Sequence, residues 1–215
     1  MGKVIVNSFT MSLDGYPAGP DQSLENPIGV GGQSLHEWAW RTKAFRDEHG
    51  LEGGETGVDH DFVVDGRANV RAYIMGRNMF APFRGEWSND AAWRGWWGEE
   101  TPYDGPVFVL SHYPREPLTM GDGTTFTFVT DGLDAALKQA RSAAGDGDIQ
   151  ISGGVSTIQQ ALHARAIDLM HLCVVPKLLG SGERLFDGFG PENFGYRCSK
   201  FISGNEVLHV VFERS

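Results

Sequence analysis

Basic residues are scarce in this sequence. Lysine and arginine total 18 against 28 aspartates and glutamates, which leaves a formal net charge of −10. A phosphate backbone attracts basic surface, so this balance argues against nucleic acid as the main partner, while a local basic pocket for a small anion remains compatible with it. No apolar run approaches the roughly 18 residues of a membrane span, and MGKVIVNSF lacks the pattern of a signal peptide. We therefore expect a cytoplasmic protein with no membrane partner.

Cysteine is also rare, and no metal-binding spacing is present. Cys173 and Cys198 form neither a CxxC pair nor another zinc pattern. Cys173 falls within an apolar segment, where a small core residue is favoured over a reactive thiol. The one local metal-like cluster is Asp59-His60-Asp61, and a solvated helix start is the favoured interpretation of it. We predict no metal site.

Several catalytic signatures are missing. The chain contains no G-x-G-x-x-G, G-x-x-x-x-G-K-[ST], G-x-S-x-G or H-E-x-x-H. These absences argue against a classical Rossmann dehydrogenase, a P-loop enzyme and an α/β hydrolase.

The most informative stretch that is present runs from Ile149 to Phe186. An apolar strand ends in Gly153-Gly154, a helix with apolar residues at helical spacing follows, and a second apolar strand, 167–175, stops before Pro176. A strand, helix, strand unit implies a parallel sheet. The helix that begins at the Gly-Gly turn offers free backbone N–H groups and the positive end of its dipole, which suit a phosphate.

The rest of the chain extends this pattern. The 215 residues show no linker or composition break, so we predict one domain over 1–215. The fold class is α/β, with a mostly parallel sheet of about eight strands, a C-terminal antiparallel hairpin and flanking helices. The additional predicted elements are strands at 3–9, 71–75, 107–110 and 125–129, a helix at 133–144, and hairpin strands at 198–203 and 206–213.

The region 16–70 reads as a lid or insertion, because 17–33 and 50–58 are rich in glycine and lack periodicity. Ser34 with Glu37 forms a capping box that predicts one helix through about residue 49. Asp59 or Asp61 is expected to cap a second helix that ends near Asn69.

Four groups suited to anions follow predicted strands. Taken singly, each has an equally good explanation as a turn or a helix cap, but four at successive strand ends favour a ligand edge. Arg77 can form paired hydrogen bonds with phosphate oxygens, and Ser111 adds a hydroxyl. The four groups are Gly76-Arg77-Asn78, Ser111-His112, Thr130-Asp131, and Gly153-Gly154 with Ser156 and Thr157.

A tryptophan-rich segment, 87–97, follows the second predicted strand. Asn89 is expected to cap a short helix that carries Trp93, Trp96 and Trp97. Packing or an interface is favoured over a substrate cage for these rings. This segment and the terminal hairpin offer surface for a homodimer.

These pieces resemble the dihydrofolate reductase-like superfamily, specifically the branch with the reductase domain of bacterial riboflavin biosynthesis. The matching segments cover most of the chain in the family's order, and the last is the most specific. They are MSLDG at 11–15, YIMGRNMF at 73–80, VFVLSH at 107–112, ISGGVSTIQQAL at 151–162 and IDLMHLCVVPKLLGSGERLFDG at 167–188.

The resemblance implies an NADPH-binding reductase with an eight-stranded sheet. It places Gly76, Arg77 and Asn78 at the pyrophosphate and adenosine phosphate, and Ser111 with His112 at the adenine ribose and its 2′-phosphate. It further implies that Gly153, Gly154, Val155, Ser156 and Thr157 hold the diphosphate. Thr10 would lie beside the nicotinamide, and Gly180 and Gly182 near the substrate end.

The substrate is expected to be a small, planar heterocycle, pterin- or pyrimidine-like. Asp14 is the first candidate for positioning or proton relay and Glu37 the second, with a bound water as the alternative to both. Trp38 and Trp40 are candidates for stacking on the substrate, with a buried helix face as the alternative. A competing hypothesis is a non-catalytic NADP-binding or interaction module.

Overall fold

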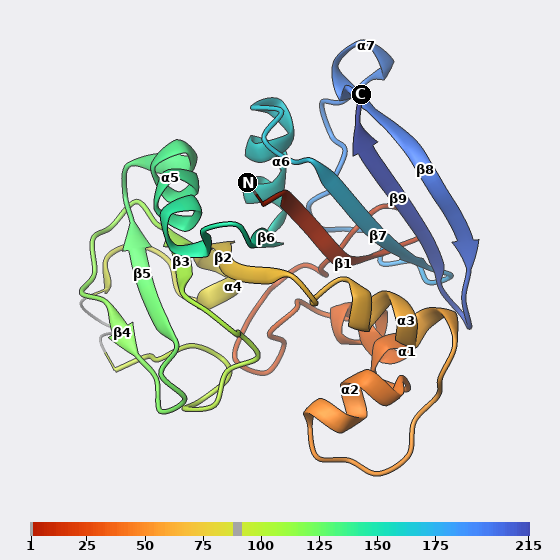
Figure 1. The fold of residues 1–215 in the computed structure, drawn as a ribbon, viewed down its shortest axis with the longest axis horizontal. Helices are drawn as coiled ribbons and strands as arrows, with labels where there is room; N and C mark the ends of the chain where they lie inside the picture. Colours follow the sequence, from red (N-terminus) through yellow and green to blue (C-terminus); the bar gives the residue numbers. More distant parts are fainter. Residues whose placement is uncertain (1, 88–91) are drawn as a thin grey trace. The chain divides into compact units, whose positions relative to one another are not determined.

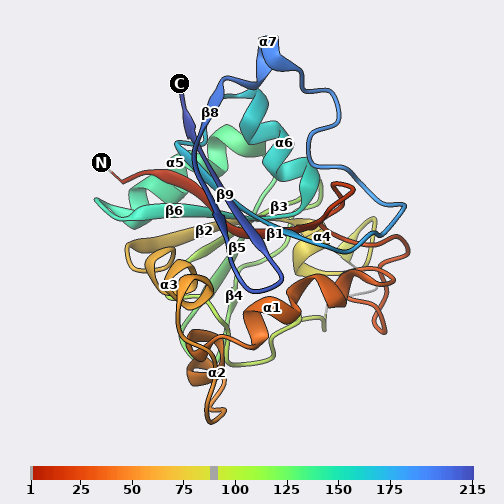
Figure 2. The same cartoon turned by 90° about the vertical axis from the view of Figure 1, so that its right-hand side faces the viewer.

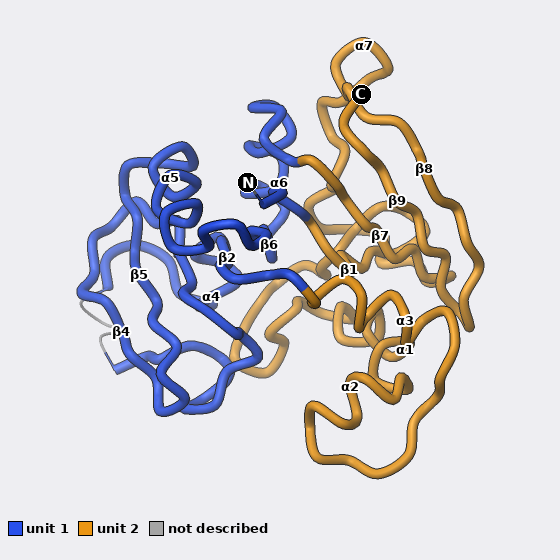
Figure 3. The backbone as a smooth tube through the Cα atoms, viewed as in Figure 1, with its two compact units in different colours: residues 1–5, 69–167 blue, residues 6–68, 168–215 orange. Residues whose placement is uncertain are grey.

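The computed structural model describes residues 2–87 and 92–215. The chain divides into two compact units, each assembled from separate stretches of sequence (Figure 3). Unit 1 comprises residues 1–5 and 69–167, and unit 2 comprises residues 6–68 and 168–215. The prediction of one domain over the whole chain stays a prediction.

Unit 1 is a mostly parallel sheet with helices packed on it (Figure 1). Its strands lie in the order β4-β5-β3-β2-β6, followed by the first residues of β1, and only the β4–β5 pair is antiparallel. The elements are β1 (Val4–Ser12), β2 (Val70–Gly76), α4 (Arg77–Phe80), β3 (Val107–Leu110), β4 (Leu118–Thr119), β5 (Thr125–Val129), α5 (Gly132–Ala144), β6 (Asp148–Gly153) and α6 (Val155–His163).

Burial explains why these segments adopt their structures. Six of the seven residues of β2 are buried, as expected for a strand of a parallel sheet that is covered on both faces. Helix α5 buries five residues spaced three and four apart, which is one face of a helix, and it packs against β2 and β3. Helix α6 packs against β6 and β2.

Unit 2 contains the rest of β1 and an antiparallel group of strands (Figure 2). The strand order is β1-β7-β9-β8, and β9 pairs antiparallel with both β7 and β8. The elements are the 3₁₀ helix η1 (Gly32–His36), α1 (Glu37–Trp40), α2 (Lys43–Glu48), α3 (Val58–Asp65), β7 (Leu169–Val175), α7 (Pro191–Phe194), β8 (Tyr196–Ser203) and β9 (Leu208–Arg214).

The predicted α/β class, its parallel strands and its C-terminal hairpin are confirmed. The described residues form nine strands, and the one beyond the predicted eight is the two-residue β4. No helix in the described ranges is long and apolar enough to cross a membrane.

The prediction of one continuous helix from Ser34 was wrong. The Ser34 hydroxyl donates to the Gly31 carbonyl, 2.8 Å away, and the segment divides into η1, α1 and α2. The break lies at Thr42, whose backbone is extended and whose hydroxyl donates to Ala39 O and accepts from the Phe45 N–H. A buried threonine therefore ends one helix and caps the next, because its side chain competes for the backbone hydrogen bonds.

Two other helix predictions also need correction. Helix α3 is preceded by Gly57 as its N-cap and ends at Asp65, so neither Asp59 nor Asp61 caps it. The segment with Trp93, Trp96 and Trp97 is not helical; Asn89, its predicted cap, lies outside the described residues. These indoles pack against other aromatic rings, including Trp93 against Phe83 and Trp97 against Tyr103, in agreement with a packing role.

Candidate functional site

Four neighbouring strand ends line one edge of the unit 1 sheet. In the strand register, Gly76 pairs with Leu110, Leu110 pairs with Val129, and Met75 pairs with Gly153. Each of the four predicted anion-binding groups lies at or directly after one of these positions. Their predicted placement at successive strand ends is therefore confirmed, and their binding role stays a prediction.

The turn between β6 and α6 is shaped by two glycines with different tasks. Gly153 is buried with φ of 137°, a conformation that residues with a side chain rarely adopt. Gly154 has φ of −73° and is the N-cap of α6, with no side chain to satisfy the first turn. A Cβ atom added at Gly154 would have no neighbour within 4 Å, so open space adjoins the helix start.

Backbone donors face this start of α6. The N–H groups of Thr157 and Ile158 donate to the Gly154 carbonyl, whereas those of Val155 and Ser156 have no intrahelical acceptor because they belong to the first turn. The positive end of the helix dipole lies at the same point. Space, backbone donors and dipole together fit one phosphate or carboxylate group.

The end of β2 lies directly against this turn. A Cβ atom at Gly76 would come within 2.5 Å of the Thr157 hydroxyl oxygen, and Thr157 is only 2 % exposed. Glycine at position 76 thus allows β2 and the start of α6 to approach closely.

We expect Gly76→Ala to lower the free energy of unfolding by about 1 to 3 kcal/mol, because overpacking at a buried contact costs that much. Thr157→Ala in the same protein removes the clashing oxygen and should recover part of the loss. Urea denaturation of both single variants and the double variant measures this coupling. Additive losses would contradict the proposed contact.

At the ends of β2 and β3, an arginine side chain stacks on aromatic rings. The Arg77 guanidinium carbon lies 3.7 Å from the centre of the Trp87 ring and 5.7 Å from that of Tyr113, and Arg77 also donates to the Gly85 carbonyl. The Trp87 indole N–H and the Ser111 hydroxyl both donate to the Tyr113 carbonyl, at 3.1 and 2.9 Å. These contacts hold Arg77 and Ser111 near each other at the strand ends. Asn78 and His112 are exposed beside them.

Of the two predicted stacking residues, Trp38 lies in the interior of unit 2. Trp38 is 4 % exposed, packs edge-on against the His209 ring and donates its indole N–H to the Thr10 hydroxyl oxygen at 3.2 Å. Thr10 is itself buried. These contacts favour the core interpretation of Trp38, whereas Trp40 is half-buried.

The two candidate proton donors are held as carboxylates. Asp14 accepts from the backbone N–H groups of Leu179 and Gly180 at 3.1 and 2.8 Å; a hydrogen bond from Ser12, followed by these backbone bonds, lowers the pKa of Asp14. Glu37 lies 2.6 Å from the Lys177 ammonium, whose hydrogen bond and charge lower the pKa of Glu37. Both side chains are therefore ionised carboxylates, and both hold the segment 177–180 in place through these bonds.

The sequence did not indicate a cluster of buried polar side chains in unit 2. His171 and Cys173 alternate along β7, and His209 on β9 is the register partner of Cys173. The exposed fractions of all three are 2 % or less, and burial raises the pKa of the Cys173 thiol, as expected of the predicted core residue. Asp59 bonds to His209 instead of forming a site with His60 and Asp61. The sequence does contain a signal for two of these residues, the pattern His171-x-Cys173 within one strand. The third residue, His209, lies 36 residues after Cys173.

Comparison with known proteins finds a matching family model and matching solved structures. The family model of the RibD C-terminal domain matches residues 3–210. A solved structure of a protein from Shewanella sp. PV-4, provisionally assigned to riboflavin biosynthesis, aligns over 100% of this chain and 99% of its own, with 25% identity and a TM-score of 0.61. No curated protein matches significantly.

Proposed function

Because the chain belongs to the RibD C-terminal domain family, a dihydrofolate reductase-like family of riboflavin biosynthesis, we propose that it is an NADPH-dependent reductase. The proposed substrate is a small planar heterocycle of the pterin or pyrimidine kind. One observation carries the cofactor assignment: four groups suited to phosphate lie along one edge of the unit 1 sheet.

The residues present at this edge fit a dinucleotide. The N–H groups of Val155 and Ser156, beside the space at Gly154, would hold the diphosphate. Arg77, placed on Trp87, and Ser111 with His112 would hold the adenosine side and its 2′-phosphate. The bound cofactor would supply the hydride, and the protein supplies binding and orientation.

A hydride transfer to a C=N or C=O bond also needs a proton. Asp14 and Glu37 are both held ionised, so we assign them positioning roles through their bonds to Gly180 and Lys177. Water is then the proposed source of the proton, which joins the nitrogen or oxygen as the hydride joins the carbon.

Substitution of Arg77 tests the cofactor assignment. We expect Arg77→Ala to raise the Kd for NADPH about tenfold or more, because a hydrogen bond to a charged group contributes about 1.5 to 3 kcal/mol. The Kd for NADH, which lacks the 2′-phosphate, should change much less. Calorimetric titration with both nucleotides measures this difference, and Arg141→Ala on α5 is the matched control.

The outcomes also separate reductase from non-catalytic module. NADPH oxidation with a compound from a panel of pterins, pyrimidines and quinones would support the reductase. Binding without turnover across that panel would favour the module, and absence of NADPH binding would overturn both.

The homodimer stays a prediction, although the edge strand β8 exposes Phe201 and Ile202.

A further inference from the structure

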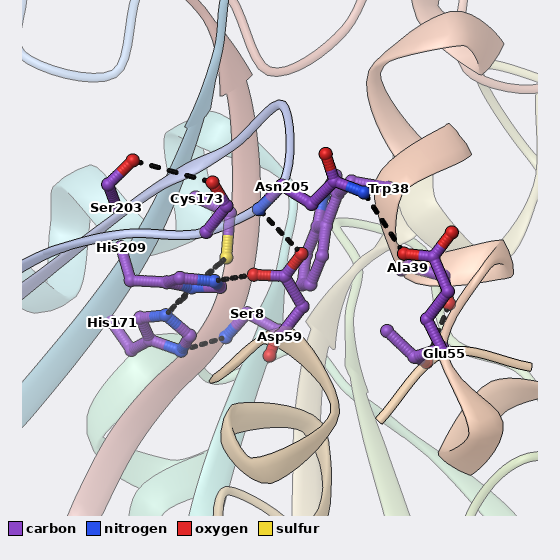
Figure 4. Close-up of polar contacts among 12 residues, drawn as sticks. Ser8, Trp38, Ala39, Glu55, Asp59, His171, Cys173, Ser203, Asn205 and His209 are labelled. Atoms are coloured by element: carbon purple, nitrogen blue, oxygen red, sulfur yellow. Dashed lines mark hydrogen bonds and ion pairs between the residues drawn. The ribbon is translucent and has the colours of Figure 1, made fainter. Parts of the chain in front are cut away.

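Three buried side chains in unit 2 converge on one point (Figure 4). The Nε2 atom of His171 lies 2.9 Å from Nδ1 of His209, and Cys173 Sγ lies 3.5 and 3.7 Å from these same two nitrogens. Cys173 and His209 are fully buried and His171 is 2 % exposed. Among the described residues, no other group of three or more histidine, cysteine or acidic side chains could hold a metal ion.

The outer atoms of both imidazoles have oxygen partners. His209 Nε2 lies 2.8 Å from Asp59 Oδ1, and His171 Nδ1 lies 3.2 Å from Asn7 Oδ1. Histidines that bind metals typically donate their other ring N–H to such an oxygen, which fixes the tautomer and the ring orientation. The Phe62 ring stacks on both imidazoles, with centroids 4.5 and 4.3 Å away, and restrains them further.

We propose that His171, Cys173 and His209 supply three ligands of a tetrahedral site for one zinc-type divalent metal ion, with a water molecule as the fourth ligand. Tetrahedral bonds of about 2.0 Å to nitrogen and 2.3 Å to sulfur separate ligand atoms by roughly 3.3 to 3.6 Å. Both sulfur–nitrogen distances agree with this spacing to within a few tenths of an ångström, and the nitrogens need to separate by a similar amount. The Cys173 thiolate and the Asp59 carboxylate together neutralise a divalent ion, which makes its burial less costly.

The metal-free cluster is held by hydrogen bonds instead. The Ser8 N–H donates to His171 Nδ1 at 3.3 Å, so the His171 Nε2–H can donate to His209, and the His209 Nε2–H to Asp59. On metal binding, the His171 proton moves from Nε2 to Nδ1, where it faces Asn7, and the Cys173 thiol loses its proton. The net exchange is one proton released for each ion bound.

The ion would join β7 to β9 and, through Asp59, to the first turn of α3. Its role is structural, because the ligands are buried. The proposal rests on unit 2 residues alone and is independent of the proposed reductase activity. Since the ligands are inaccessible in the folded chain, the ion is best introduced during refolding.

Cobalt(II) serves as the spectroscopic probe. The full chain is denatured with a chelator, desalted and refolded with Co²⁺. We expect one equivalent to bind with thiolate-to-cobalt charge-transfer absorption, and zinc to displace it and raise the thermal midpoint by roughly 5 °C or more. Absence of this absorption, or absorption without a midpoint shift, would overturn the proposal.

The second cysteine provides the matched control. Cys198→Ser removes an exposed thiol and should keep the absorption, whereas Cys173→Ser should abolish it. The opposite pattern would reveal adventitious binding at the surface and contradict the site. X-ray absorption spectroscopy of the zinc-loaded Cys198→Ser protein identifies the ligands directly. This measurement does not require the Cys173→Ser variant to fold. We expect one sulfur and two imidazole nitrogens, and a shell without sulfur would refute the site.

Discussion

Gly154→Asp should raise the Kd for NADPH about 100-fold or more while the protein stays folded. A carboxylate at this position would lie beside the N–H groups that are proposed to hold the diphosphate. Placing like charges together at an interface costs several kcal/mol. Calorimetric titration of wild type and variant with NADPH measures the effect.

The fold should tolerate this change because of local geometry. Gly154 has a negative φ, and a Cβ atom there meets nothing within 4 Å. It is also the N-cap of α6, where aspartate and asparagine are favourable and differ from glycine by only a few tenths of a kcal/mol.

Gly154→Asn separates charge from size. Asparagine has nearly the same shape as aspartate, so its variant should bind NADPH distinctly better than Gly154→Asp. Equal affinities for the two variants would mean that no anionic group lies at the α6 start. Wild-type affinity in Gly154→Asp would exclude this turn from the cofactor site.

The second large effect is a loss of stability as the pH falls, caused by His171. Burial, followed by the charges of His209 and Lys200, lowers the pKa of His171 from 6.5 to about 3. The unfolded chain takes up the proton as the pH falls through 6.5, and the folded chain does so only near 3. The contribution of neutral His171 to the free energy of unfolding is therefore fully present above pH 6.5. It is lost between pH 6.5 and 3, at about 1.4 kcal/mol per pH unit.

Urea denaturation in the presence of a chelator, at pH values from 7 to 4, measures this slope. His171→Asn should be less stable at pH 7 and should show a shallower pH dependence by about one proton. His112→Asn removes an exposed imidazole and should keep the wild-type slope. An unchanged slope in His171→Asn would mean that the imidazole is not held neutral in the folded chain.

Features that depend on local sequence could be predicted, because apolar runs and turn residues determine them directly. The Gly153-Gly154 turn, helix α5 and the C-terminal hairpin are examples. Since parallel strands bring their carboxyl ends to one edge, the strand order along the chain also predicted where Arg77 and Ser111 would lie.

Features that depend on distant partners could not be predicted in this way. The helix break at Thr42 accompanies the burial of this residue and its bridge to Glu55, 13 residues further along the chain. The Asp14 carboxylate accepts hydrogen bonds from backbone N–H groups that lie 165 and 166 residues away in the chain. The His171, Cys173 and His209 cluster required the pairing of β7 with β9, which no local spacing reveals.

The central claim is that the strand-end edge of unit 1 binds the NADPH diphosphate. A crystal structure of the protein soaked with NADPH tests it most directly. We predict density for the diphosphate within hydrogen-bonding distance of the Val155 and Ser156 N–H groups, with the 2′-phosphate near Arg77. Cofactor density elsewhere on the chain, or an empty edge at millimolar NADPH, would contradict the claim.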